Sequence, residues 1–83
     1  MSKGARRRVV GTVTKHEPYG FYVDFGDEQD GLVVITMVVD DPNISNPVFP
    51  PIGFTIEAVL LGYTDLGNQP RLSTRPVDID ALE

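Results

Sequence analysis

Glycine and proline interrupt this chain every few residues, and that spacing limits the secondary structure the chain can form. The 83 residues include 8 glycines and 7 prolines, and the apolar runs between them are short. No stretch sustains apolar residues at the i, i+3, i+4, i+7 spacing of an amphipathic helix. The sequence therefore predicts an all-β domain made of short strands.

Five segments have the composition or alternation of strands. β-Branched residues fill the first of them. In residues 21–25, Phe21, Val23 and Phe25 point to one face, and Tyr22 and Asp24 point to the other. This alternation places Tyr22 on the outward face. The predicted strands are residues 8–16, 21–25, 32–36, 54–61 and 70–74.

The connection between the third and fourth predicted strands is long and rich in proline. Residues 40–53 contain four prolines, a composition that excludes pairing as a central strand. Closure into a barrel would remove the exposed edges that five short strands otherwise leave. Length and strand count favour the five-stranded OB-fold barrel. An SH3-like barrel is the competing architecture.

Charge is distributed unevenly along the chain. Residues 1–8 hold four basic side chains and no acid, a charge of +4, whereas the remainder has three basic side chains against twelve acids, a charge of −9. We expect a flexible basic arm at residues 1–7, the barrel at residues 8–75 and an acidic, solubilising tail at residues 76–83 that could form one helical turn. The arm could attract phosphate or simply aid solubility.

Composition argues against several classes of function. The chain has no Cys, so it offers no disulfide, thiol nucleophile or Cys-based zinc site. Its start lacks the apolar core of a signal peptide, and no apolar run approaches the roughly 20 residues that cross a bilayer. We expect a cytoplasmic domain without a membrane partner. His16 is the only histidine, and no Gly-rich phosphate loop or Ser/His/Asp order occurs, so we expect no metal, cofactor or catalysis.

Several short motifs follow one another in a distinctive order. They are Gly-x-Val at residues 11–13, Tyr-Gly-Phe-Tyr-Val at 19–23, Gly-Leu-Val-Val-Ile-Thr at 31–36 and Arg-Leu-Ser at 71–73. Their order and spacing resemble the S1 domain family. The resemblance implies an OB-fold domain that binds single-stranded nucleic acid, RNA before DNA, and has no catalytic step.

The resemblance also implies which residues meet the RNA. Tyr19 and Tyr22 match the two family aromatics that flank the turn glycine, where a tyrosine can stack a base. Val34 stands where the family commonly has His, so it can pack on a ribose but cannot hydrogen-bond. Arg71 matches the basic residue of the Arg-Leu-Ser ending and would contact phosphate. From the residues alone, Tyr19 could equally cap the barrel, and Tyr22 could simply favour a strand.

Four further basic residues complete the nucleic-acid-binding candidates. Lys15 would meet phosphate, and Arg6, Arg7 and Arg8 would add non-specific attraction. With so few cations, we expect binding to be weak and strongly dependent on salt.

A second function remains open from the sequence. Three features are also compatible with a barrel that has lost nucleic-acid affinity. They are the charge of −9 on the chain after residue 8, Val34, and Gln69 at the position where the family has a basic residue. Such a barrel would be a protein-interaction or regulatory module. The apolar segment 48–52, which includes Phe49, could dock a protein partner or pack over one end of the barrel. The sequence leaves the oligomeric state open.

Overall fold

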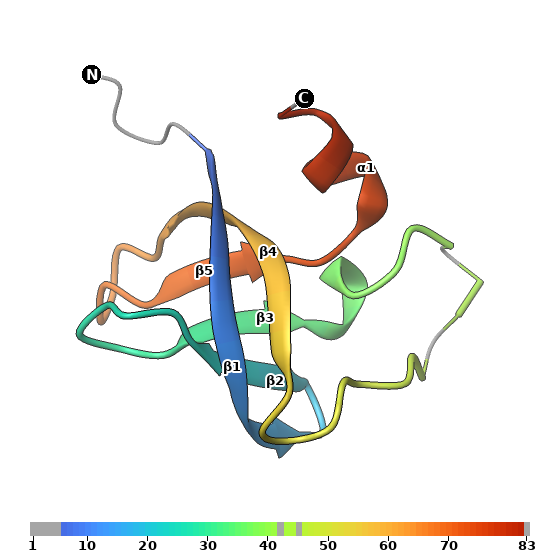
Figure 1. Cartoon of the computed structure of the whole chain (residues 1–83), viewed down its shortest axis with the longest axis horizontal. Helices are drawn as coiled ribbons and strands as arrows, with labels where there is room; N and C mark the ends of the chain where they lie inside the picture. The colour runs from blue at the N-terminus through green and yellow to red at the C-terminus, as the bar shows by residue number, and fades with distance from the viewer. Residues whose placement is uncertain (1–5, 42, 45, 83) are drawn as a thin grey trace.

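Five strands, one 3₁₀ helix and one short α-helix make up the fold (Figure 1). The structure is a computed structural model that describes residues 6–41, 43–44 and 46–82. The elements are β1 (Arg7–Glu17), β2 (Gly20–Asp24), β3 (Gly31–Val34), η1 (Ile35–Met37), β4 (Thr55–Tyr63), β5 (Pro70–Ser73) and α1 (Pro76–Asp80).

The strands close into a barrel in the order β1-β2-β3-β5-β4, with β4 returning to β1. Every neighbouring pair is antiparallel except β3 and β5, which run parallel. This is a five-stranded OB-fold barrel, so the predicted fold class is confirmed and the SH3-like alternative is not the one observed.

The 11-residue strand β1 closes the barrel because it pairs with two neighbours. Residues 7–12 pair with β4, and residues 12–17 pair with β2. The register shifts between Val13 and Lys15, where an extra residue lets the strand bend from one partner to the other.

Alternating side chains from all five strands fill the barrel. The fully buried Phe21 and Val23 confirm the alternation predicted for residues 21–25, and Tyr22 between them faces outward. The buried core residues are Val9, Val13, Phe21, Val23, Val33, Val38, Ala58, Leu60 and Leu72. Burial of these apolar side chains is the main source of stability for the barrel.

The third strand is shorter than predicted. β3 ends at Val34. Residues 35 and 36, which the sequence predicted as the end of this strand, belong to η1 instead. The reason is the position of its partner: Val34 pairs with Gly20, the first residue of β2, so no strand lies alongside Ile35. The Ile35 amide donates instead to the carbonyl of Tyr19, 3.0 Å away in the turn before β2.

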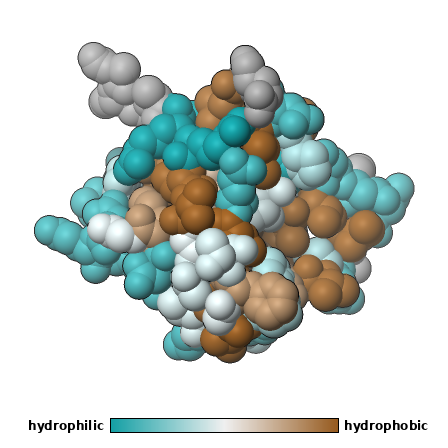
Figure 2. Space-filling view, in the orientation of Figure 1, coloured by the Kyte–Doolittle hydropathy of each residue, from teal (hydrophilic) through white to brown (hydrophobic). Residues whose placement is uncertain are grey.

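The proline-rich connection packs over one end of the barrel. The ring of Phe49 lies 5.2 Å from that of Phe21 and 5.4 Å from that of His16. His16 Nε2 also lies 2.7 Å from the carbonyl oxygen of Pro50. Phe49 is thus a half-buried core contact rather than an exposed docking side chain. Its neighbour Val48 is 91% exposed, and Figure 2 shows apolar patches among hydrophilic ones on the face seen there.

The C-terminal helix covers the outer face of β4 and β5. Val59 and Ser73 are fully buried, although Val59 lies between Ala58 and Leu60, which point into the barrel. Side chains alternate between the two faces of a strand, so Val59 points outward from β4, the strand that α1 contacts.

Asp78 of α1 is buried, which corrects its assignment to a solubilising tail. The residue is 6% exposed, and its carboxylate accepts a hydrogen bond from Ser73 Oγ at 2.5 Å. It also forms ion pairs with Arg75 Nε at 2.9 Å and Arg6 Nη1 at 3.2 Å. Hydrogen bonds from Arg75 and Ser73 lower the pKa of Asp78 below its ordinary value, although burial opposes this shift.

The predicted basic arm is only partly described. Residues 1–5 lie outside the described residues, and β1 begins at Arg7. Arg6 is held against α1 by its ion pair with Asp78. Neither η1 nor α1 is long and apolar enough to cross a membrane, and the described residues contain no other helix.

Replacing Asp78 with asparagine should destabilise the protein by about 2 kcal/mol at neutral pH, because an amide cannot balance two guanidinium groups. The carboxylate has a lowered pKa in the fold, so its contribution is complete above its unfolded-state pKa and is lost as the pH falls through the folded-state value. The difference between wild type and Asp78→Asn should therefore shrink in acid. Urea denaturation over a range of pH measures this difference.

The matched control is Asp80→Asn on the same helix, because Asp80 is exposed. Its effect should stay within about 0.5 kcal/mol. Equal losses in the two variants would contradict a special role for Asp78.

Candidate nucleic-acid interface

One row of side chains crosses the outer face of four strands. Lys15 on β1 pairs with Tyr22 on β2. Tyr22 pairs with Leu32 on β3, and Leu32 pairs in turn with Arg71 on β5. Neighbouring strands lie about 4.8 Å apart, so the row spans about 14 Å. We call these four residues the β-face row.

The two predicted stacking residues lie next to each other. Tyr19 is in the turn between β1 and β2, and its hydroxyl oxygen lies 2.9 Å from that of Tyr22. The ring centroids are 6.3 Å apart and the ring planes are nearly perpendicular, at 89°. Tyr19 is 48% exposed and Tyr22 is half-buried, so the pair forms an aromatic surface that solvent can reach.

The phenol pair also affects ionisation. The hydrogen bond with Tyr22 is the largest influence on Tyr19, and it raises the pKa of Tyr19 from 10.0 to about 12. Partial desolvation and the nearby charge of Glu17 act in the same direction. Tyr19 therefore stays neutral well above neutral pH.

Gly20 brings the turn close to β3. Its φ of +155° is one that side-chain-bearing residues rarely adopt, and a Cβ there would lie 2.1 Å from the carbonyl oxygen of Val33. Gly20 pairs directly with Val34, so no side chain stands opposite Val34 on this face. Val34 is half-buried and lies two residues from Leu32 on the same face of β3. It extends the apolar part of the row.

The two cations of the row have different surroundings. Lys15 Nζ lies 2.8 Å from Glu17 Oε2, and this hydrogen bond and charge raise the pKa of Lys15. The guanidinium of Arg71 forms no ion pair or hydrogen bond with any other residue that the structure describes. Arg71 is thus the cation of the row best able to meet an anion.

The three arginines predicted for the site lie at the other end of β1. Arg7 pairs with Leu60 of β4, about 26 Å along the strand from Lys15. Arg6 is paired with Asp78, and Arg8 Nε lies 3.1 Å from Glu57 Oε2. In Figure 1 β1 begins at the end of the barrel near α1, opposite the turn between β1 and β2. The structure therefore brings together Lys15, the tyrosines, Val34 and Arg71, but not the three arginines.

Leu32 is a member of the row that the sequence prediction missed. The alternation of β3 would have identified it, because Leu32 and Val34 share one face of the strand. Its importance comes from pairing with both Tyr22 and Arg71, and a sequence does not state that register.

The third tyrosine belongs to a different part of the barrel. Tyr63, at the end of β4, donates a hydrogen bond to Asp27 Oδ2 at 2.7 Å. Nearby, the side-chain amide of Gln69 donates a hydrogen bond from Nε2 to the backbone carbonyl of Asp30 at 2.6 Å. Gln69, at the position where a basic residue was expected, thus links the connection between β4 and β5 to the connection between β2 and β3. Across residues 6–41, 43–44 and 46–82, no group of three or more His, Cys, Asp or Glu side chains could hold a metal ion.

Comparison with known proteins identifies the family. The family model of the S1 RNA binding domain matches residues 3–75 of this chain. The chain belongs to the S1 domain family. It is therefore an RNA-binding-type S1 domain, and the match confirms the resemblance drawn from the motifs. A comparison with curated proteins finds no match.

The fold of this S1 domain also occurs among solved structures. One similar structure is the intact alpha subunit of aIF2 from Pyrococcus abyssi, with a TM-score of 0.66 and 18% sequence identity. The match covers 90% of the S1 domain but only 31% of the aIF2 subunit. At this identity the likeness supports the fold alone.

The Tyr22→Phe substitution should lower the pKa of Tyr19 from about 12 toward its ordinary value of 10.0, because it removes the phenol that hydrogen-bonds to Tyr19. An NMR titration of the Tyr19 ring carbons measures the shift. The control is Tyr63→Phe, which removes a phenol elsewhere and should leave the Tyr19 titration unchanged. An unchanged Tyr19 pKa in Tyr22→Phe would show that the two phenols do not interact in solution.

Proposed function

We propose that this S1 domain binds single-stranded RNA across the β-face row, by base stacking and phosphate contacts, without a catalytic step. The observation that carries the proposal is the register that places Tyr22 between Lys15 on one side and Leu32 and Arg71 on the other. Bases stack on aromatic rings while cations meet the phosphates that link them.

Stacking is the main source of affinity in this proposal. An aromatic side chain contributes about 1–3 kcal/mol for each base that it stacks. Tyr22 would hold one base and Tyr19 a neighbouring one. Leu32 and Val34 would offer apolar surface to the riboses. Stacking tolerates every base, because each base has a π-face.

Phosphate contacts are few, so the affinity should be modest. Each phosphate contact to a single strand contributes about 0.7 to the slope of log affinity against log salt. Arg71 and Lys15 would supply two contacts, and Glu17 weakens the second. The body of the domain carries −9, so long-range attraction for a polyanion is small.

The N-terminal arginines would act only on a longer RNA. They lie about 26 Å from Lys15 along β1, and at physiological salt exposed charges are screened beyond about 8 Å. Two of them already have carboxylate partners. Their contribution to a short RNA on the row should therefore be small.

The alternative of a protein-binding barrel keeps its acidic body but loses one candidate contact side chain. Its candidate contact was Phe49, and that ring packs against Phe21 and His16 at the barrel end. RNA binding rests instead on a row of outward-facing residues on four strands.

The Tyr22→Ala variant should bind a short, mixed-sequence RNA about tenfold more weakly than the wild type, because it removes one stacking surface. Fluorescence anisotropy of a labelled octanucleotide at low salt measures the affinity. The control is Tyr63→Ala, which removes a tyrosine that lies outside the row and is 46% exposed. Loss of affinity in both variants alike, or in neither, would contradict stacking on the row.

The Arg71→Gln variant should reduce the salt slope for the same octanucleotide by about 0.7, because one phosphate contact is lost. The measurement is the dissociation constant over a series of salt concentrations. Arg8→Gln removes a cation at the far end of β1 and should leave this slope unchanged. If Arg8→Gln reduced the slope and Arg71→Gln did not, the RNA would follow a different path over the barrel.

A further inference from the structure

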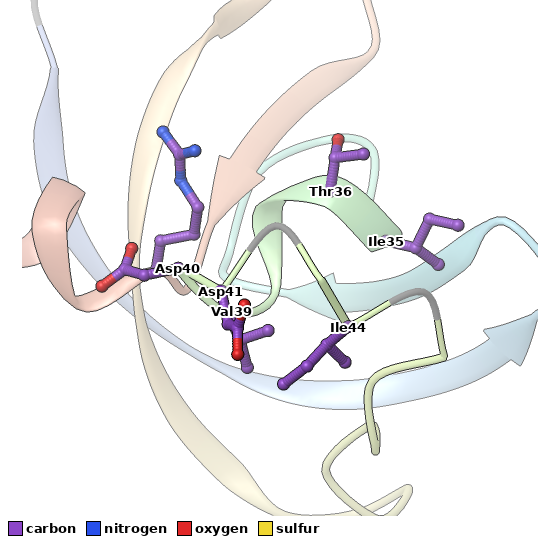
Figure 3. A pocket seen from close by; sticks show the side chains of 7 residues that line it. Ile35, Thr36, Val39, Asp40, Asp41 and Ile44 are labelled. Carbon is purple, nitrogen blue, oxygen red and sulfur yellow. The ribbon is translucent and has the colours of Figure 1, made fainter.

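A cavity of about 450 Å³ lies between η1 and the start of the proline-rich connection (Figure 3). Its volume is within the range of pockets that hold small organic ligands. Ile35, Val39 and Ile44 give it apolar walls, and Asp40, Asp41 and Arg75 give it polar ones.

The cavity is joined directly to the stacking turn. Ile35, which lines it, donates its backbone amide to the carbonyl of Tyr19 at 3.0 Å. An RNA strand that continued from Tyr22 past Tyr19 toward Ile35 would reach the wall of the cavity. The cavity can then receive a base while the phosphates remain outside, near solvent.

The two carboxylates of the cavity have different orientations. Asp40 Oδ1 lies 3.5 Å from the backbone nitrogen of Val77 in α1, and Figure 3 shows its carboxylate turned to that side. Asp41 Oδ1 accepts the backbone amide of Asn43 at 2.9 Å. Within the described part of the chain, no group donates to Asp41 Oδ2. Asp41 is thus the acceptor best placed to meet a ligand.

We propose that this cavity is a base-reading subsite that accepts a base with an exocyclic amine, cytosine or adenine, and disfavours uracil. The proposal rests on the proposed RNA-binding function. A carboxylate accepts a hydrogen bond from N4 of cytosine. Uracil presents the O4 acceptor at the same position, and two acceptors cannot bond each other. The three apolar side chains would pack against the base.

A cationic protein side chain is the competing occupant, because carboxylates also attract lysine and arginine. Arg75 already supplies a cation on the cavity wall, where it contacts Asp78 at 2.9 Å and is attracted by Asp40, so Asp41 is the carboxylate left for either occupant. The hydrogen bond between Ile35 and Tyr19 is the observation that favours the RNA base.

The test compares hexacytidine with hexauridine, which have the same length and charge. Wild type should bind hexacytidine about tenfold more tightly. Asp41→Asn should reduce this ratio to near one, because an amide has both a donor and an acceptor and can pair with either base. The matched control is Asp40→Asn, which makes the same change of charge on the neighbouring residue. It should raise both affinities and keep the ratio.

Every outcome separates the two proposals. Failure of wild type to bind either oligonucleotide would overturn the proposed function and the subsite with it. Equal binding of both by wild type, or an unchanged ratio in Asp41→Asn, would overturn the subsite alone. The backbone amides of Ile35, Val39 and Ile44 should also shift on addition of hexacytidine in NMR spectra. Shifts of these amides with an arginine-containing peptide, but not with hexacytidine, would assign the cavity to a protein partner instead.

Discussion

The pairing of β1 with two different strands is the constraint on which the rest of the structure depends. Its first half hydrogen-bonds to β4 and its second half to β2, so this one strand closes the barrel. The shift between Val13 and Lys15 sets the register of the second half and brings Lys15 opposite Tyr22. Barrel closure and the alignment of the β-face row thus have a common origin.

Local patterns predicted what depends on local geometry. Strand alternation has a period of two, so residues 21–25 showed that Phe21 is buried and that Tyr22 faces outward. The motif order was sufficient to indicate the family. The pairing of Leu32 with Arg71 is a contact between segments far apart in the chain, and no local pattern specifies it. The early end of β3 was missed for the same reason, because it depends on where β2 begins.

The partners of the charged residues were the feature that the sequence predicted least well. The acidic end and the basic start looked like two solvated segments because a count of charges carries no information about partners. In the fold, Arg6 and Asp78 form an ion pair across almost the whole length of the chain, and Arg75 completes the group. Asp78 is also the reason that a helix of five residues can be held against the barrel. Of the predicted site residues, the tyrosines, Val34, Lys15 and Arg71 lie on one face, whereas the N-terminal arginines lie at the other end of β1.

The ion pair between Arg6 and Asp78 also determines how the domain can be connected to other modules. It holds both ends of the folded region at the same pole of the barrel, and the turn that carries Tyr19 is at the opposite pole (Figure 1). Sequence fused before Arg6 or after α1 would therefore emerge away from the stacking surface. The domain can be inserted into a loop of another protein, or joined in tandem with copies of itself, while the turn that carries Tyr19 stays open.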